Sequence, residues 1–477
     1  MLLSNADFYH IDNLMKIMRN IENMGKLKDG YYSPEIQEMS KDLLRLRKEM
    51  KGMPIKERTD IADVISDMKS EMTEKKRIEI EETAKEIGNG NADYSITVTK
   101  IKGHDTFIAN DLNAVIISQI IKQELRRSYK IEPSNMDMVI EQIISLIDNP
   151  MPKIIIRADI CHFFESIPQK LLINKLAEDG FISRRTLKYL KGILFRCNDL
   201  TKNDSAIGVP RGLAFSSYLS ELYMKTVDAA ISKMDGVYFY TRYVDDIIIV
   251  ADPSKAKMEE YWDNVDALLK NRHLQLHNDS EKKFMAVLCE GTAHIHFDYL
   301  GYRFIYESGS LFVEMSEKRF TKYQILTDAI FDIYSKCSHY RTGKDGNRKK
   351  MRRDALHQLI TRIRTLTSNG YLSGRKNYVS AGIYYSNKYI TRYGQLEYLD
   401  KYIASKIDDE NSFCPPSNLF NYGQGNGYAE NIQHIRDFLH QFTFSSGYHE
   451  RRVYKKGYFS RTLMDLQHIY YSRKNKG

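Results

Sequence analysis

The stretch Val237–Asp252, VYFYTRYVDDIIIVAD, decides which fold the rest of the chain must fit. Two apolar runs, rich in β-branched and aromatic residues, flank a polar break at Asp245-Asp246, and this pattern predicts a β-hairpin. Adjacent carboxylates at a hairpin tip repel each other, so each needs solvent, a cation or hydrogen-bond donors. An Asp-Asp pair is also ordinary turn chemistry. The hairpin alone therefore leaves a plain turn and a metal site as open alternatives.

A third carboxylate comes from Lys153–Pro168, KIIIRADICHFFESIP. The apolar run Ile154–Ile156 predicts a buried strand that ends at Asp159, and the aromatic FFE stretch opens the next element. A carboxylate at the end of a central strand is costly to bury unless it is paired or holds a metal. Asp159 and the hairpin tip together could hold two hard cations through oxygen ligands. Nucleotidyl transfer by two metal ions requires such an arrangement.

Between the two acidic segments lies Gly208–Met224, GVPRGLAFSSYLSELYM. Gly208 and Gly212 bracket a proline-arginine turn, and an amphipathic helix is predicted to follow. Glycine lets a backbone approach a nucleotide closely, and the serines at the predicted helix start are candidate hydrogen-bond donors. A simple helix-capping loop would account for this segment if it stood alone.

The composition is that of an ordinary globular protein. The 477 residues suffice for about two to four domains, with 42% hydrophobic and 28% charged residues. A net charge of +9 favours an anionic partner such as nucleic acid. The five cysteines include no C-x-x-C pair, which argues against a zinc site or a disulfide framework. No secretion signal or membrane span is recognisable, so we expect a cytoplasmic protein without membrane contact.

Helical segments are predicted on both sides of the acidic motifs. Residues 1–92 are highly charged, and a packing or oligomerisation role is favoured for them. Toward the other end, helices are predicted at 320–335 and 349–367, and the second is strongly basic. A basic helix followed by a tyrosine cluster suits contact with a nucleic-acid backbone and stacking on bases. A plain solvated face is the alternative.

In this order and spacing, Asp159, the G-x-P-R-G loop and Y-V-D-D resemble the palm of reverse transcriptases. HLQLHNDSEKKF (273–284) and FDYLGYRF (297–304) resemble the next two motifs of that family, so the resemblance covers roughly residues 105–305. It implies an α/β (α+β) fold with three parts. These are a helical N-terminal extension at 1–92, right-hand fingers and palm at 93–310, and a helical, basic, Tyr-rich thumb or C-terminal domain at 311–477.

The resemblance implies catalytic and metal-binding roles. Asp159, Asp245 and Asp246 are the implied ligands of two Mg²⁺ ions, with Mn²⁺ as an alternative metal. The backbone carbonyl of Ile160 is an implied helper. A lysine near the triphosphate, expected to assist the leaving group, is Lys282, with Lys283 the near alternative.

The resemblance also implies contacts with substrates. Phe164 occupies the position at which the family excludes a ribose 2′ hydroxyl, so deoxynucleoside triphosphates are the expected substrates. Arg211 replaces the glutamine usual in retroviral enzymes, and Gly212 is expected beside the incoming base pair. The nucleotide-binding candidates are Lys153, Arg157, Phe164, Arg211, Gly212 and Ser216, and the primer or template candidates are Tyr243, Leu300, Gly301, Arg352 and Arg353.

The motifs R-x-D-I-x-x-F-F-E-S-I and G-x-P-R-G-L-x-x-S-x-x-L-x-E-L-Y-M are similar to those of bacterial defence-associated and abortive-infection reverse transcriptases, once called the unknown groups. This resemblance implies an RNA-directed DNA polymerase of an anti-phage system, with a non-coding RNA as template or partner and DNA as product. A homo-oligomer or a second defence protein is a further expectation. Template-independent or protein-primed DNA synthesis, a mobile-element or maturase enzyme, and an RNA-binding scaffold are the alternatives.

Overall fold

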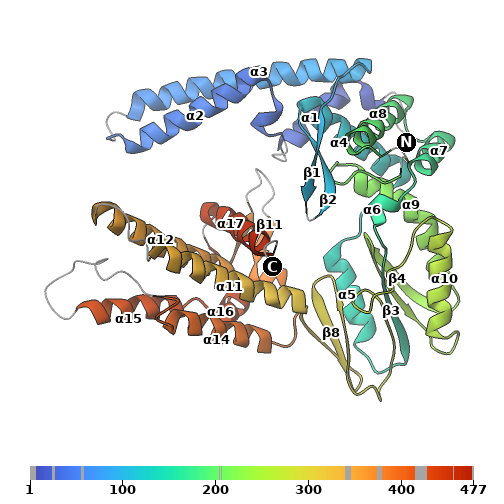
Figure 1. Ribbon diagram of the computed structural model, residues 1–477. Coiled ribbons are helices and arrows are strands. Elements are labelled where there is room, and N and C mark those ends of the chain that lie inside the picture. Colours follow the sequence, from blue (N-terminus) through green and yellow to red (C-terminus); the bar gives the residue numbers. More distant parts are fainter. Residues whose placement is uncertain are drawn as a thin grey trace. The chain divides into compact units, whose positions relative to one another are not determined.

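A computed structural model describes residues 7–23, 27–54, 58–101, 103–203, 205, 207–338, 345–372, 379–413, 427–454 and 456–474. The chain forms two compact units (Figure 1). The first comprises Met1–Val139 with Pro152–Val287, and the second comprises Ile140–Met151 with Leu288–Gly477. The boundaries of these two units differ in kind from the three parts expected at 1–92, 93–310 and 311–477. That three-part division therefore remains a prediction.

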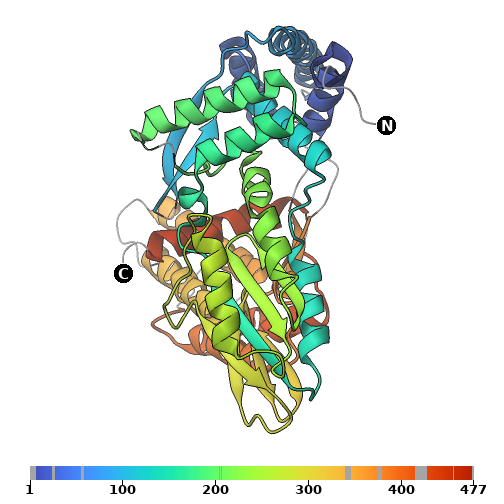
Figure 2. The same cartoon turned by 90° about the vertical axis from the view of Figure 1, so that its right-hand side faces the viewer.

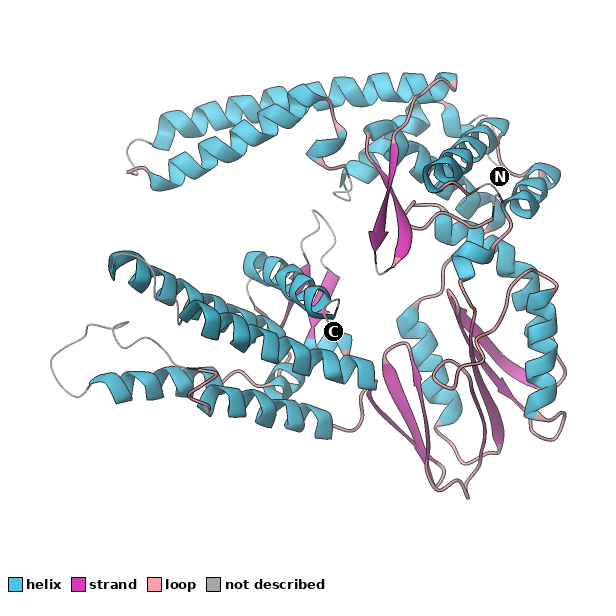
Figure 3. Cartoon of the chain, in the orientation of Figure 1, coloured by secondary structure: helices cyan, strands magenta, loops and turns pink. Residues whose placement is uncertain are grey.

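The first unit begins with the charged helices predicted for the N-terminal extension. Helices α2 (Pro34–Gly52) and α3 (Arg58–Asn89) pack side by side (Figure 3). Lys75 of α3 forms ion pairs with Glu35 of α2 and Glu71 of its own helix. The preceding elements are η1 (Asp7–Tyr9), α1 (Ile11–Asn23) and η2 (Asp29–Tyr31). The predicted helical extension is confirmed.

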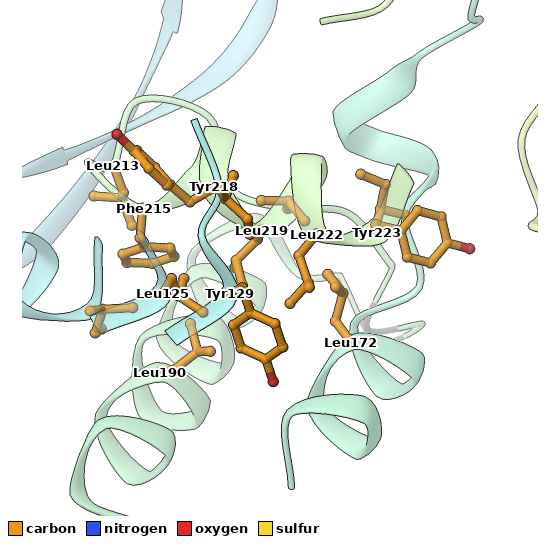
Figure 4. Close-up of a cluster of buried hydrophobic side chains, with 14 of the residues drawn as sticks. Leu125, Tyr129, Leu172, Leu190, Leu213, Phe215, Tyr218, Leu219, Leu222 and Tyr223 are labelled. Carbon is orange, nitrogen blue, oxygen red and sulfur yellow. The ribbon is translucent and has the colours of Figure 1, made fainter. Parts of the chain in front are cut away.

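A small hairpin and a helical layer follow. Strands β1 (Ile96–Ile101) and β2 (His104–Ala109) pair antiparallel, and α8 packs against β1 (Figure 2). Asp111 caps the next helix because its side chain accepts a hydrogen bond from the Ala114 amide at 2.7 Å. Buried leucine and aromatic side chains from α4, α7, α8 and α9 join these elements into one core (Figure 4). The helices of this layer are α4 (Leu112–Tyr129), α6 (Phe163–Ser166), α7 (Gln169–Asp179), α8 (Arg184–Thr201) and α9 (Ser216–Ile231).

A four-stranded sheet carries the acidic motifs, with strand order β4-β5-β3-β6. The apolar run of β5 is completely buried between its neighbours, which is why it consists of isoleucine and valine. Helix α9 packs against β4, and α10 packs against β3. The predicted hairpin and the predicted buried strand are both present. The elements are β3 (Lys153–Asp159), β4 (Val237–Tyr243), β5 (Asp246–Ala251), α10 (Met258–Lys270) and β6 (Phe284–Leu288).

The second unit contains a three-stranded antiparallel meander of β7 (Ile295–Tyr299), β8 (Tyr302–Glu307) and β9 (Ser310–Met315). The segment that follows α5 (Met136–Ile147) is fixed to this meander by two hydrogen bonds. Tyr306 donates its hydroxyl to the Asn149 carbonyl at 2.8 Å, and the Leu311 amide donates to the Asp148 carboxylate at 3.0 Å.

The remainder of the second unit is mostly helical, as predicted. A short hairpin of β10 (Asn369–Leu372) and β11 (Val379–Gly382) interrupts the helices and was not anticipated from the sequence. The helices are α11 (Glu317–Ser338), α12 (Asp345–Leu366), α13 (Ile383–Ser386), α14 (Gly394–Asp408), α15 (Gly427–His440), α16 (Phe444–His449) and α17 (Lys456–Lys474). In the part of the chain that the structure describes, no helix combines the length and apolarity needed to cross a membrane. The predicted mixed α/β fold with helical N- and C-terminal regions is confirmed.

Candidate active site

The β4–β5 hairpin brings three aspartates to one end of the sheet. Asp159, the last residue of β3, is the register partner of Asp246, the first residue of β5. Asp245 lies in the two-residue turn between β4 and β5, and its carbonyl accepts a hydrogen bond from the Ile160 amide at 3.0 Å. Val244 adopts φ +62° in this turn, a left-handed conformation that is rare for a β-branched residue.

Excess negative charge is the main electrostatic feature of this site. Burial raises the pKa of Asp245, and the charge of Asp159 raises it further. Burial also raises the pKa of Asp246, where Arg157 acts in the opposite direction and Asp159 again adds to the rise. Asp159 itself is 3% exposed. The charge of Asp159 therefore makes ionisation of both Asp245 and Asp246 harder.

Two basic side chains neutralise part of this charge. Lys282 places its Nζ 2.6 Å from Asp159 Oδ2. Arg157 places its Nη2 3.0 Å from Asp246 Oδ1 and donates from Nη1 to the Glu281 carbonyl at 3.0 Å. Arg157 is an expected nucleotide contact; in the structure it pairs with a carboxylate, and the nucleotide contact remains a prediction.

The two adjacent lysines, Lys282 as the expected residue and Lys283 as its alternative, have different surroundings. Lys283 lies 3.9 Å from the centre of the Trp262 ring and so is turned to a different surface from Lys282. A further neighbour of the carboxylates is His277, whose Nε2 lies 3.4 Å from Asp159 Oδ1. His277 was not singled out from the sequence, although it belongs to the quoted HLQLHNDSEKKF segment.

The donor set suits a hard divalent cation. Within the described ranges, no three His, Cys, Asp or Glu side chains form a ready-made cation site. The carboxylate oxygens of Asp159, Asp245 and Asp246 are nevertheless the ligands that Mg²⁺ prefers. The raised pKa values of two of them indicate a negative charge that a bound cation would relieve. These residues fit the expected metal.

The glycine loop is held against the β1–β2 hairpin. Gly212 has φ +96°, and a Cβ atom there would lie 2.4 Å from the carbonyl oxygen of Phe107. The Phe107 amide donates to the Arg211 carbonyl at 2.8 Å. A glycine is required at this close approach. The Arg211 side chain is paired with Glu165 and lies over the Phe164 ring, with 4.8 Å between the guanidinium carbon and the ring centre.

Residues 95–304 match the sequence model of the family described as "Reverse transcriptase (RNA-dependent DNA polymerase)". The chain contains a reverse transcriptase domain. The domain is that of a nucleotidyltransferase, and it includes β1 to β7, the three aspartates and the glycine loop. The curated proteins include no match to the chain.

Solved structures similar to this chain include three telomerases. Telomerase from Candida albicans with a TWJ fragment of telomeric RNA is 15% identical, with 74% of this chain and 56% of that chain covered and a TM-score of 0.30. The corresponding Candida tropicalis complex is 12% identical, with 79% and 61% covered and a TM-score of 0.33. Apo telomerase from Candida tropicalis is 11% identical, with 98% and 84% covered and a TM-score of 0.32. The chain thus spans little more than half of the first of these telomerases, and a likeness at this level carries no functional argument.

Three further candidates of the reverse transcriptase domain lie near its sheet or loop. Tyr243 is the register partner of Asp246 at the end of β4. Ser216 begins α9, is 4% exposed, and donates its hydroxyl to the Pro210 carbonyl, so it supports the loop. Lys153 lies at the opposite end of β3 and is 1% exposed, so the structure does not bring it to the aspartates.

The remaining candidates belong to the second unit. Leu300 and Gly301 form the β7–β8 turn of the reverse transcriptase domain, with φ of +47° and +84°. The Leu300 carbonyl accepts a hydrogen bond from Arg319 at 3.1 Å. Arg353 is exposed on α12, and the side chain of Arg352 lies outside the described residues. The predicted primer and template roles of these residues remain predictions.

The structure also contains an ion cluster around a buried arginine, which the sequence analysis did not identify. Arg242 of β4 is 4% exposed and binds Glu221 at 2.6 Å and Asp228 at 2.8 Å, both on α9. The same guanidinium donates to the Val244 carbonyl at 2.7 Å. This cluster therefore fixes the hairpin turn from which Asp245 extends. The sequence signal for this cluster is an arginine within a largely apolar strand, because a buried arginine needs acidic partners.

One C-terminal tyrosine, Tyr448, packs against two others. Tyr448 lies 5.4 Å from Tyr384 and 5.8 Å from Tyr393, measured between ring centres. Tyr448 is 6% exposed, whereas Tyr393 is 41% exposed. Tyr448 is therefore a core residue. Exposed tyrosines such as Tyr393 remain the candidates for stacking on bases.

Proposed function

We propose that the protein is an RNA-directed DNA polymerase that adds deoxynucleotides to a 3′ hydroxyl by two-metal catalysis. The convergence of Asp159, Asp245 and Asp246 at one end of the sheet carries this proposal. Their place inside a matched reverse transcriptase domain supports it.

The roles of the residues follow from their surroundings. Asp159, Asp245 and Asp246, with the Ile160 carbonyl, would hold Mg²⁺ or Mn²⁺. When bound, the metals supply activation of the 3′ hydroxyl and neutralisation of the leaving pyrophosphate. Lys282 places its amine beside Asp159, where a proton or a positive charge would serve the leaving group.

Contacts on the nucleotide side come from the glycine loop and α6. Arg211 and Phe164 form a paired surface beside the loop, and Gly212 gives the backbone room to approach a base pair. An aromatic face next to the sugar favours deoxynucleotides, because a 2′ hydroxyl there would lose water without gaining a partner.

We further propose a role in a bacterial anti-phage defence system, with a structured non-coding RNA as template, DNA as product and a cytoplasmic location. Support comes from the resemblance of R-x-D-I-x-x-F-F-E-S-I and the G-x-P-R-G-L motif to the defence-associated enzymes. Helical regions on both sides of residues 95–304 are consistent with a chain that does more than copy a template.

One preparation tests these proposals in two steps. Purified protein is incubated with labelled deoxynucleotides and Mg²⁺, and the nucleic acids that copurify with it are sequenced. We expect incorporation that Asp245→Ala abolishes, and a DNA product complementary to one copurifying RNA. Unchanged incorporation by Asp245→Ala would refute the mechanism. A product with no complementary RNA would instead indicate template-independent synthesis, and DNA linked to protein would indicate protein priming.

A further inference from the structure

Glu165 holds Arg211 in a fixed orientation. Oε1 of Glu165 accepts from Arg211 Nε at 2.7 Å, and Oε2 accepts from Nη2 at 2.9 Å. A two-point contact of this kind sets the plane of the guanidinium as well as its position. Burial would raise the pKa of Glu165, but the hydrogen bonds from Arg211 bring it below its usual range, as expected for a carboxylate that stays ionised.

Arg211 in turn covers one face of Phe164. The guanidinium carbon lies 4.8 Å from the ring centre, and the ring packs edge-on against Phe163 with 5.4 Å between centres. Both phenylalanines and Glu165 are consecutive residues of α6. The Phe164 ring is thus held from two sides.

The Glu165–Arg211 pair acts on one of the proposed catalytic carboxylates. The charge of Arg211 reaches Asp245, where it opposes burial, the main cause of the raised pKa of Asp245. The backbone of Arg211 is also fixed, since its carbonyl accepts from the Phe107 amide at 2.8 Å. On the far side, His104 of β2 places its Nδ1 3.1 Å from Glu165 Oε1. Three elements therefore meet at the Glu165–Arg211 pair.

We propose that Glu165 is a positioning residue for sugar selectivity: by fixing Arg211 over Phe164, it keeps the ring rigid beside the nucleotide's sugar and so excludes ribonucleotides. This inference rests on the proposed function. A rigid aromatic wall rejects a 2′ hydroxyl, because the hydroxyl loses its water and finds no acceptor. If Arg211 no longer covers Phe164, the ring can rotate away and leave room for the 2′ hydroxyl of a ribonucleotide.

The test compares incorporation of dGTP and GTP by the wild-type protein and by Glu165→Gln. The variant keeps the size of the side chain but loses its charge. We expect the ratio of kcat/KM for dGTP to that for GTP to fall about tenfold, the scale on which one pocket contact discriminates between substrates. Glu165→Asp retains a carboxylate and should recover part of the ratio.

The matched control is Glu132→Gln, which breaks the exposed pair of Glu132 with Arg126 at 2.7 Å in the same unit. It should leave the ratio unchanged, and thermal melting checks that each variant is folded. An unchanged ratio in Glu165→Gln would overturn the inference, as would a parallel loss of both activities. If the wild-type protein incorporates neither nucleotide, the proposed function fails. Equilibrium binding of dGTP and GTP with Mg²⁺ then tests the inference separately. The ratio of the Kd for GTP to the Kd for dGTP should fall about tenfold in Glu165→Gln.

Discussion

Lys282 lies 2.6 Å from the Asp159 carboxylate, whereas its neighbour Lys283 lies over the ring of Trp262. Two adjacent lysines thus have opposite surroundings, one acidic and one aromatic. Trp262 is 6% exposed, so Lys283 covers a core side chain.

We expect Lys282→Met to lower the rate of nucleotide incorporation by about two orders of magnitude, the scale of a lost general acid. Lys283→Met should retain the rate and lose roughly 1 kcal/mol of stability through its cation–π contact. Single-turnover incorporation and urea unfolding measure the two effects. Equal loss of rate in both variants would contradict the assignment.

Asp245→Asn should stabilise the metal-free protein while abolishing incorporation. The pKa of Asp245 is raised in the folded protein, so its ionised form at neutral pH costs folding free energy. Asparagine removes this cost, and we expect a gain of about 1 kcal/mol. Because the wild-type carboxyl is protonated at low pH in both states, the difference should disappear as the pH falls below the ordinary range of aspartate.

Thermal melting in EDTA across this pH range checks the prediction for Asp245. Asp199→Asn is the control, since Asp199 is an exposed partner of Arg196 at 3.4 Å and should change neither stability nor incorporation. A variant less stable than the wild type at neutral pH would contradict the expected repulsion.

Arg157→Met should destabilise the protein by about 3 kcal/mol, because it leaves the partly buried Asp246 without its counter-charge. Arg157→Lys should recover only part of this loss, since one ammonium cannot reproduce the forked contact with Asp246 and the Glu281 carbonyl. Adding Asp246→Asn to Arg157→Met should restore stability, which urea unfolding of the double-mutant cycle would measure. Strict additivity of the two changes would refute the coupling.

Arg242→Met should cost about 3 kcal/mol, because it leaves Glu221 and Asp228 as partly buried, unbalanced charges. Tyr240→Phe removes only the 2.6 Å hydrogen bond to Asp228, so about 1 kcal/mol is expected. Comparing unfolding and incorporation for the two variants separates loss of folding from loss of hairpin geometry. A mild effect of Arg242→Met would mean that the ion cluster does not support the turn.

The sequence could predict the three aspartates because Asp159 and Asp246 lie at strand ends and Asp245 lies in the adjoining turn, and the residue patterns of these strands are local. The pairing of Asp159 with Asp246 then follows from the order of the strands. The resemblance favoured Lys282 but kept Lys283 as an alternative, since the direction of adjacent side chains in a loop depends on tertiary packing. The partners of Arg242 were equally hidden, because Glu221 and Asp228 reach it only through the packing of α9 on β4.

Because Val244 adopts a left-handed backbone conformation, the Y-V-D-D hairpin depends on the rest of the fold to keep its shape. Its turn is held by the bond from Arg242 to the Val244 carbonyl, and Arg242 is tolerable in a core only with its two partners on α9. Grafted into another scaffold without that helix, the hairpin would carry an unpaired buried charge. A chimeric protein that takes α9 from one parent and the β4–β5 hairpin from another would therefore lose the site unless both parents carry the same ion cluster.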